Sequence, residues 1–164
     1  MLALGVDPGT ETTGYAIVEE DNHGFLRAVS YGVIKTSQKD TAQKRLQIIF
    51  KEMSELISLH RPQTGAVEKL FFQKNVTTAL AVGQARGVIL LAMAEAEVEI
   101  AEYSPQEVKM AVTGYGAAEK KQVQTMVQTM LSLSELPKPD DAADALAIAI
   151  CHLHSIGYRK RLEQ

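Results

Sequence analysis

Four acidic side chains occupy positions at which an apolar segment begins or ends. They are Asp7 in Gly-Val-Asp-Pro-Gly-Thr, Glu68 in Ala-Val-Glu-Lys, and Asp141 with Asp144 in Asp-Ala-Ala-Asp-Ala-Leu. A carboxylate beside apolar structure costs free energy unless an opposite charge compensates it. Carboxylate oxygens are the ligands that hard cations such as Mg²⁺ prefer. The four residues therefore indicate a site for a divalent cation.

Asp7 and Glu68 each follow a short apolar run. Residues 2–6 form a run that Pro-Gly stops, and Glu68 ends a second run at residues 65–67. If both runs are strands and lie parallel as neighbours, their axes are about 4.8 Å apart and the carboxylates meet. Ligands in open α/β sheets bind at this edge. The alternative for Asp7 alone is an aspartate favoured by turn chemistry.

Asp141 and Asp144 are three residues apart, which places both on one face of a helix predicted over residues 140–156. The alternative is that these acidic residues cap the helix and complement its dipole. We assign that structural role to Asp140, because it points about 100° away from Asp141 around the helix.

The pattern of apolar residues predicts an α/β fold with a mixed five-stranded sheet flanked by helices. Residues 1–164 are expected to form a single domain. The first three strands are antiparallel, with a hairpin turn at residues 21–24. Strands are predicted at residues 2–6, 14–20, 25–36, 64–68 and 98–103, and helices at residues 41–59, 75–95, from 104, 118–133 and 140–156.

Six motifs occur in an order that resembles the RuvC family of bacterial Holliday-junction endonucleases, over residues from about 2 to about 152. They are Gly-Val-Asp-Pro-Gly-Thr, Thr-Thr-Gly-Tyr-Ala, the segment from Glu68 to Phe71, Gly-Gln-Ala-Arg-Gly, Ala-Glu-Lys and Asp-Ala-Ala-Asp-Ala-Leu-Ala. The resemblance implies a ribonuclease H-like fold and a homodimeric, Mg²⁺-dependent enzyme that resolves four-way DNA junctions in recombination and DNA repair. Its paired, symmetric nicks leave a 5′ phosphate and a 3′ hydroxyl.

The resemblance also implies roles for individual residues. The catalytic residues and metal ligands would be Asp7, Glu68, Asp141 and Asp144, which would hold two Mg²⁺, with Mn²⁺ as a substitute. A branch-migration helicase would be a partner.

DNA contacts are expected at two groups of residues. Phe71, three residues after Glu68, would stack on an unpaired base, although a core role for Phe71 and Phe72 is the alternative. Gln73, Lys74 and Asn75 would contact the DNA backbone, and Lys109 and Lys120 would hold phosphate with help from Lys121.

The predicted helix at residues 75–95 is apolar nearly all round, which is typical of a core helix. Gly83 and Gly87, four residues apart, would let another backbone approach closely. The resemblance favours a homodimer interface at these glycines over burial within one subunit.

The composition agrees with a cytoplasmic protein. Cys151 is the single cysteine, so an internal disulfide is excluded, and its apolar surroundings indicate a core thiol. The longest apolar run, residues 88–94, is too short to span a membrane. The chain has 17 Lys and Arg against 20 Asp and Glu, a formal net charge of -3, so DNA binding would depend on local basic clusters. For residues 44–51 we favour a solvated basic face.

Two other classes of function remain open at this point. Asp-Pro-Gly-Thr also resembles the first phosphate loop of actin-like kinases and ATPases, although those enzymes enclose the nucleotide between two domains. A non-catalytic junction-binding module would be favoured if any of the four carboxylates were missing. Among nucleases, the smaller YqgF-type enzymes are the near alternative, and the 141–144 segment with the glycine-containing helix argues against them.

Overall fold

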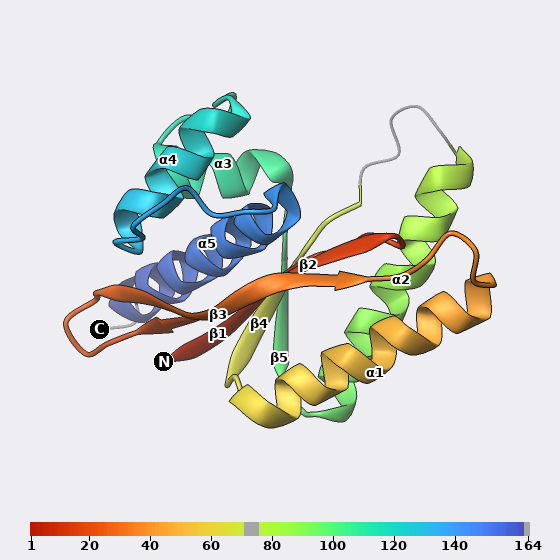
Figure 1. The fold of residues 1–164 in the computed structure, drawn as a ribbon. Coiled ribbons are helices and arrows are strands. Elements are labelled where there is room, and N and C mark those ends of the chain that lie inside the picture. Colours follow the sequence, from red (N-terminus) through yellow and green to blue (C-terminus); the bar gives the residue numbers. More distant parts are fainter. Residues whose placement is uncertain (71–75, 163–164) are drawn as a thin grey trace.

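The computed structural model describes residues 1–70 and 76–162, with the backbone alone for residues 76–77 and 159–162. The chain alternates between strands and helices after three leading strands (Figure 1). The strands are β1 (Leu2–Asp7), β2 (Thr12–Glu20), β3 (Leu26–Lys35), β4 (Thr64–Glu68) and β5 (Glu99–Tyr103). The helices are α1 (Ala42–His60), α2 (Val76–Glu95), α3 (Pro105–Thr113), α4 (Lys120–Met130) and α5 (Asp140–Leu162).

The five strands form one mixed sheet in the order β3-β2-β1-β4-β5. β1 pairs antiparallel with β2, and β2 with β3. β1 and β4 are parallel, as are β4 and β5. The predicted mixed five-stranded sheet and its antiparallel start are therefore confirmed.

Helices cover both faces of the sheet. α3, α4 and α5 lie on one face, and α1 and α2 lie on the other (Figure 1). Successive side chains of β2 point to opposite faces of the sheet. Ala16 and Val18 therefore face α5, whereas Ile17 faces α1. Each face of the sheet therefore has its own apolar cluster.

Local signals in the sequence account for most of the turns and helix starts. Asp21 Oδ1 accepts hydrogen bonds from the main-chain N–H groups of His23 and Phe25, which closes the predicted hairpin turn. Thr41 caps α1. Ser104 forms a capping box with Glu107 at the start of α3.

Two helix boundaries differ from the prediction. α4 is shorter than residues 118–133, because Glu119 forms a capping box with Gln122 at its start and Ser132 adopts a positive φ of 51° just after its end. α5 continues to Leu162, beyond the predicted end at residue 156, with Gly157 inside the helix. A single glycine in a helix costs only about 1 kcal/mol, so it does not force a stop.

α2 is the one helix among the described residues that is long and apolar enough to cross a membrane, judged by length and composition alone. The window Thr78–Glu95 has a mean hydropathy of 1.2. The core helix of a soluble protein passes the same test. α2 contributes Ala85, Ile89 and Met93 to the core on the α1 face, but only 22% of the window is buried, so packing within the subunit explains only part of its apolar character.

Cys151 is buried on α5, as predicted, and its thiol donates to the main-chain oxygen of Glu107 at 3.8 Å. Burial raises the pKa of this thiol to about 11. The thiol is therefore protonated at neutral pH, which fits a structural residue and not a nucleophile.

Candidate active site

The sheet brings Asp7 and Glu68 to the same edge. Val6 of β1 pairs with Val67 of β4 in parallel register, and each strand ends at the next residue. Neighbouring strands lie about 4.8 Å apart, so the two carboxyl groups are adjacent. The structure confirms the arrangement of strands on which this part of the site was predicted.

Glycines let α5 bring Asp141 to that edge. Asp7 pairs across the sheet with Gly14 of β2, and a Cβ atom at Gly14 would overlap the main chain of Asp141. Farther along the helix, a Cβ atom at Gly5 would overlap Ala145 and Ala149 of α5. The first turn of α5 can therefore rest directly on the sheet beside Asp7 only because these strand positions lack side chains.

Arg86 supports the strand end that carries Glu68, and the sequence analysis assigned it no role. Its guanidinium donates from Nε to the main-chain oxygen of Glu68 at 3.3 Å and pairs through Nη2 with Glu102 of β5 at 2.6 Å. Its side chain is only 17% exposed. The available signal in the sequence was a charged residue within a largely apolar helix, because such a charge needs a partner when it is buried.

The electrostatics of the four carboxylates are unfavourable without a cation. Burial raises the pKa of Asp7 to about 8, with further contributions from the negative charges of Glu68, Asp144 and Asp141. Burial, followed by the charge of Asp144, raises the pKa of Glu68. The pKa of Asp144 is raised as well, first by burial. The carboxylates therefore repel one another when they are ionised, and a bound divalent cation would offset this repulsion.

The donor set fits a hard divalent cation, since it consists of carboxylate oxygens without thiol or imidazole. Among the described residues, however, no three His, Cys, Asp or Glu side chains stand close enough together to hold one ion as they lie. Chelation therefore requires rotation of these side chains toward one another. The main chains of the four residues already lie at the same edge of the sheet, on α5 and at the ends of β1 and β4.

Lys120 of α4 contacts the carboxylates directly. Its Nζ lies 3.2 Å from Oδ2 of Asp144 and 3.2 Å from Oδ2 of Asp140. Burial opposes the charge of Lys120, but Asp144 and Asp140 outweigh it, so the pKa of Lys120 is raised. Asp140 also accepts a hydrogen bond at 2.9 Å from the side-chain amide of Gln124, which lies on the same helix α4 as Lys120.

The other two predicted basic residues lie at different distances from the site. Lys109 of α3 lowers the pKa of Glu68 through its charge, which places it near that carboxylate. Lys121 lines a separate groove between the end of α3 and α4, together with Tyr115 and Gln122. Adjacent helical residues point about 100° apart, which explains why Lys120 and Lys121 face different surroundings.

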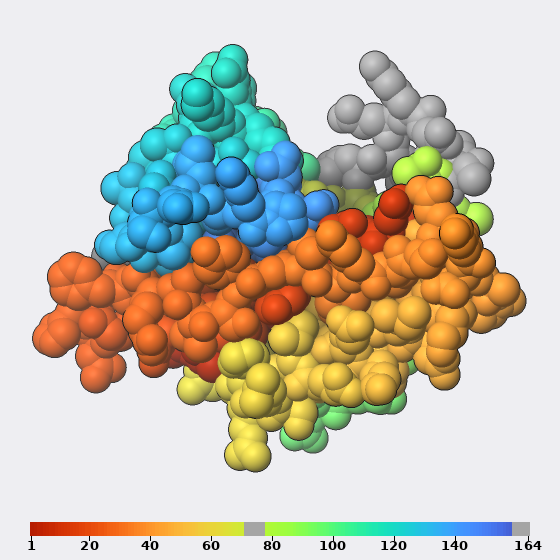
Figure 2. Space-filling view, in the orientation of Figure 1, coloured from red at the N-terminus to blue at the C-terminus, as the bar shows by residue number. Residues whose placement is uncertain are grey.

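The space-filling view shows the lobe of α3 and α4, in cyan, standing above the sheet, with α5, in blue, beside it (Figure 2). The predicted DNA-contacting residues Phe71, Gln73, Lys74 and Asn75 lie outside the described residues.

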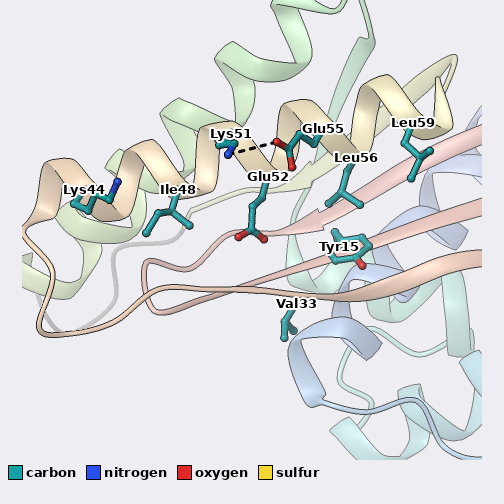
Figure 3. Close-up of a pocket in the computed structure, with 9 residues that line it drawn as sticks. All are labelled: Tyr15, Val33, Lys44, Ile48, Lys51, Glu52, Glu55, Leu56 and Leu59. Carbon is teal, nitrogen blue, oxygen red and sulfur yellow. Dashed lines mark ion pairs between the residues drawn. The ribbon is translucent and has the colours of Figure 1, made fainter.

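A groove on the opposite, α1 face of the sheet contains none of the four carboxylates. It has a volume of about 520 Å³ and is lined by Tyr15 of β2 and by residues of α1, including Lys44 and Lys51 (Figure 3). Lys51 pairs with Glu55 at 3.8 Å. Both lysines are exposed, which agrees with the predicted solvated face.

The two predicted interface glycines lie on α2. A Cβ atom at Gly87 would meet no atom within 4 Å, whereas one at Gly83 would touch Leu70 at 3.6 Å. Leu80 and Leu91 of the same helix are 63% and 52% exposed. Gly87 therefore lies in the open beside exposed leucines, and Gly83 is closer to its own subunit.

The mixed sheet, its helical layers and the acidic edge together define a nuclease of the ribonuclease H-like class. The Thermus thermophilus RuvC structure in complex with a Holliday junction substrate matches with a TM-score of 0.93 and 36% identity, covering 97% of this chain and 96% of that one. The yeast mitochondrial Holliday junction resolvase Ydc2 shares the fold, with a TM-score of 0.66 and 13% identity.

Sequence comparisons identify the family. The profile of the family described as crossover junction endodeoxyribonuclease RuvC matches residues 3–152. RuvC of Heliobacterium modesticaldum is 54% identical over 156 residues, covering 95% of this chain and 96% of that protein. RuvC of Syntrophomonas wolfei is 50% identical and covers 99% of this chain and 94% of that protein. The chain belongs to the RuvC family of crossover junction endodeoxyribonucleases, which are metal-dependent nucleases.

Proposed function

We propose that residues 1–164 form one nuclease domain that resolves four-way DNA junctions by paired, symmetric, Mg²⁺-dependent nicks leaving a 5′ phosphate and a 3′ hydroxyl. The observation that carries the proposal is the meeting of Asp7, Glu68 and the first turn of α5 at one edge of the sheet. Family membership favours this activity over an actin-like phosphotransfer domain. The presence of all four carboxylates favours it over a non-catalytic junction-binding module.

The proposed metal ligands are Asp7, Glu68, Asp141 and Asp144, with Asp7 between the other three. Two ions bound there would polarise the attacking water and neutralise the charge that develops on the scissile phosphate. The partial burial of Asp7 strengthens its interaction with a cation, because the surroundings screen charge less than water does. Arg86 holds the main chain of Glu68 while the carboxylate side chains rotate into place.

Lys120 has two successive roles in this proposal. It neutralises Asp144 before metal and DNA bind. A cation held by the carboxylates would repel the lysine, and Lys120 could then hold a phosphate of the scissile strand. Lys109, near Glu68, contacts the same strand, and Lys121 contacts DNA beyond the site along the groove of α3 and α4.

Phe71 is proposed to stack on an unpaired base at the crossover, since base stacking on an aromatic ring is worth about 1–3 kcal/mol and tolerates any base. Gln73, Lys74 and Asn75 would contact the DNA backbone next to it. This segment directly follows the strand that ends at Glu68, so the bound base would lie close to the cleaved phosphate.

A homodimer through α2 would present two active sites to the two-fold symmetric junction. The helix has an exposed stripe at intervals of three and four residues, formed by Leu80, Gln84, Gly87 and Leu91. Gly87 allows close approach of a partner helix at the centre of the stripe. We further propose action in the cytoplasm together with a branch-migration helicase.

A substrate and metal panel tests the proposed function. Purified protein is incubated with a synthetic four-way junction, a duplex of the same sequence and an RNA–DNA hybrid. We expect cleavage of the junction alone with Mg²⁺ or Mn²⁺, and binding without cleavage in Ca²⁺, whose longer and looser coordination does not suit two-metal hydrolysis. Cleavage of the hybrid alone, or efficient cutting in Ca²⁺, would contradict the proposal.

A further inference from the structure

A buried histidine lies on α5 at a distance from the four carboxylates. His152 is only 3% exposed. Its Nε2 lies 2.6 Å from Oγ1 of Thr64, and its Nδ1 lies 3.0 Å from Oη of Tyr103. Thr64 is the first residue of β4, and Tyr103 is the last residue of β5. The proposed cleavage mechanism uses none of these three side chains.

The hydrogen-bond partners of His152 favour one neutral tautomer of the ring. Thr64 Oγ1 donates to the main-chain oxygen of Glu99 at 3.2 Å, and a hydroxyl group has only one hydrogen to donate. With that hydrogen directed to Glu99, Thr64 accepts its bond from His152 Nε2. The neutral ring with a proton on Nε2 satisfies this requirement, and Nδ1 then accepts from the Tyr103 hydroxyl.

The two residues bonded to His152 belong to the strands around Glu68. Thr64 and Glu68 are the two ends of β4, and Glu68 pairs with Tyr103 across the sheet. On the helix side, Asp141 and His152 are eleven residues apart, which is about three turns and about 17 Å. Both therefore lie on the face of α5 that meets the sheet.

Gly5 of β1 lies against small residues of α5. A Cβ atom there would overlap Ala145 and Ala149. Apolar contacts fix how closely a helix approaches a sheet, but they are non-directional. Hydrogen bonds depend on distance and angle, so the bonds of His152 resist sliding of α5 along its axis.

We propose that His152 is a positioning residue that fixes α5 along its axis and thereby holds Asp141 and Asp144 in register with Asp7 and Glu68. The inference rests on the proposed function, because it concerns the metal site of that function. Its consequence is that the affinity for Mg²⁺ depends on a network about three helical turns away from Asp141.

The test replaces the whole network by apolar residues of similar shape. Thr64→Val/Tyr103→Phe/His152→Leu removes the three mutually bonded side-chain groups together, so it is expected to cost less stability than removing His152 alone and leaving Thr64 and Tyr103 without its bonds. The Mg²⁺ concentration at half-maximal rise in Tm is expected to increase about 10-fold, since supporting residues around metal ligands affect affinity on this scale. The half-maximal Mg²⁺ concentration for junction cleavage should increase in parallel.

The matched control is Leu153→Ala, which truncates a fully buried side chain at the next position of α5 and leaves Thr64, Tyr103 and His152 unchanged. It should lower Tm, because such substitutions cost about 2–5 kcal/mol, and leave both Mg²⁺ midpoints unchanged. Should the triple variant fail to fold, Tyr103→Phe removes one oxygen atom and is expected to raise the midpoints about 3-fold.

Unchanged midpoints in the folded triple variant, or in Tyr103→Phe, would overturn the role of His152. An equal shift in Leu153→Ala would also overturn it, because loss of stability would then be the cause. The parent protein assayed in parallel separates the two proposals. If the parent cuts no junction, the proposed function fails, whereas a cutting parent beside an unshifted variant refutes only the positioning role.

Discussion

Nζ of Lys120 lies 3.2 Å from Oδ2 of Asp144, so the proposed metal site contains its own positive charge. The same lysine lowers the pKa of Asp7 and of Asp144, against the larger upward effect of burial on both groups. The carboxylates can therefore ionise at lower pH than burial alone would allow. The start of α4 thus prepares the site to bind a cation.

Lys120→Met should move the acid limb of the cleavage profile to higher pH. Without the lysine charge, the pKa values of Asp7 and Asp144 rise, and the carboxylates ionise only at higher pH. We expect a shift of roughly 0.5–1 pH unit, measured as initial cleavage rate against pH at fixed Mg²⁺. Lys121→Met is the control, because that lysine lines a separate groove. An equal shift in both variants would refute a specific role for Lys120.

Asp7→Asn should stabilise the protein at pH 8 in the presence of a chelator. The folded-state pKa of about 8 lies above the ordinary value of 3.8, so the folded state binds more protons between these values. Stability therefore falls as pH rises from about 4 to about 8. The amide should add about 1–3 kcal/mol, less than the full pKa shift implies because Asp7 is partly exposed.

The measurement is thermal unfolding of the parent and Asp7→Asn in chelator at pH 5 and pH 8. The gain corresponds to about 2–4 °C in Tm per kcal/mol for a chain of this size. It should be larger at pH 8 than at pH 5. Saturating Mg²⁺ at pH 8 should stabilise the parent but not the variant. If Asp7→Asn is less stable than the parent at pH 8 in chelator, Asp7 does not carry a buried negative charge that lacks compensation.

Local patterns in the sequence were sufficient to predict the strands, their mixed pairing and the shared edge of Asp7 and Glu68. Each of those features depends on an apolar run and the residue that stops it. The contacts of Lys120 and Arg86 could not be predicted, because they join elements distant in sequence. The close approach of α5 to the sheet depends on Gly14 of the Thr-Thr-Gly-Tyr-Ala motif. The contact between Gly14 and Asp141 joins residues far apart in the sequence, so it is evident only from the structure.

Gly14→Ala should slow cleavage without abolishing junction binding. The added methyl group would overlap the main chain of Asp141, so the first turn of α5 must move away from Asp7. Overpacking of this kind typically costs about 1–3 kcal/mol of stability. We expect a higher half-maximal Mg²⁺ concentration and a lower maximal rate, measured on folded protein at a temperature well below Tm. A parental rate and Mg²⁺ dependence would show that the position of α5 does not matter.

Leu91→Glu should convert the proposed dimer to monomers, because it places a charge in the exposed stripe of α2 that forms the proposed interface. Gly87→Leu should have the same effect by pushing the two helices apart. Sedimentation measures the mass, and junction cleavage should fall because one subunit cannot nick two strands symmetrically. Leu59→Glu, at an exposed leucine of α1, is the control and should remain dimeric. Normal dimers and paired nicks in Leu91→Glu would place the interface elsewhere.

The most direct measurement compares junction cleavage and junction binding by the parent protein, Asp7→Asn and Asp140→Asn in Mg²⁺. Asp7→Asn removes a central ligand and also reduces repulsion of phosphate, so cleavage should fall at least about 100-fold while binding stays equal or becomes tighter. Asp140→Asn should cut the junction, because Asp140 bonds to Lys120 and Gln124 and is not a proposed metal ligand. Cleavage at the parental rate by Asp7→Asn would contradict the proposed active site.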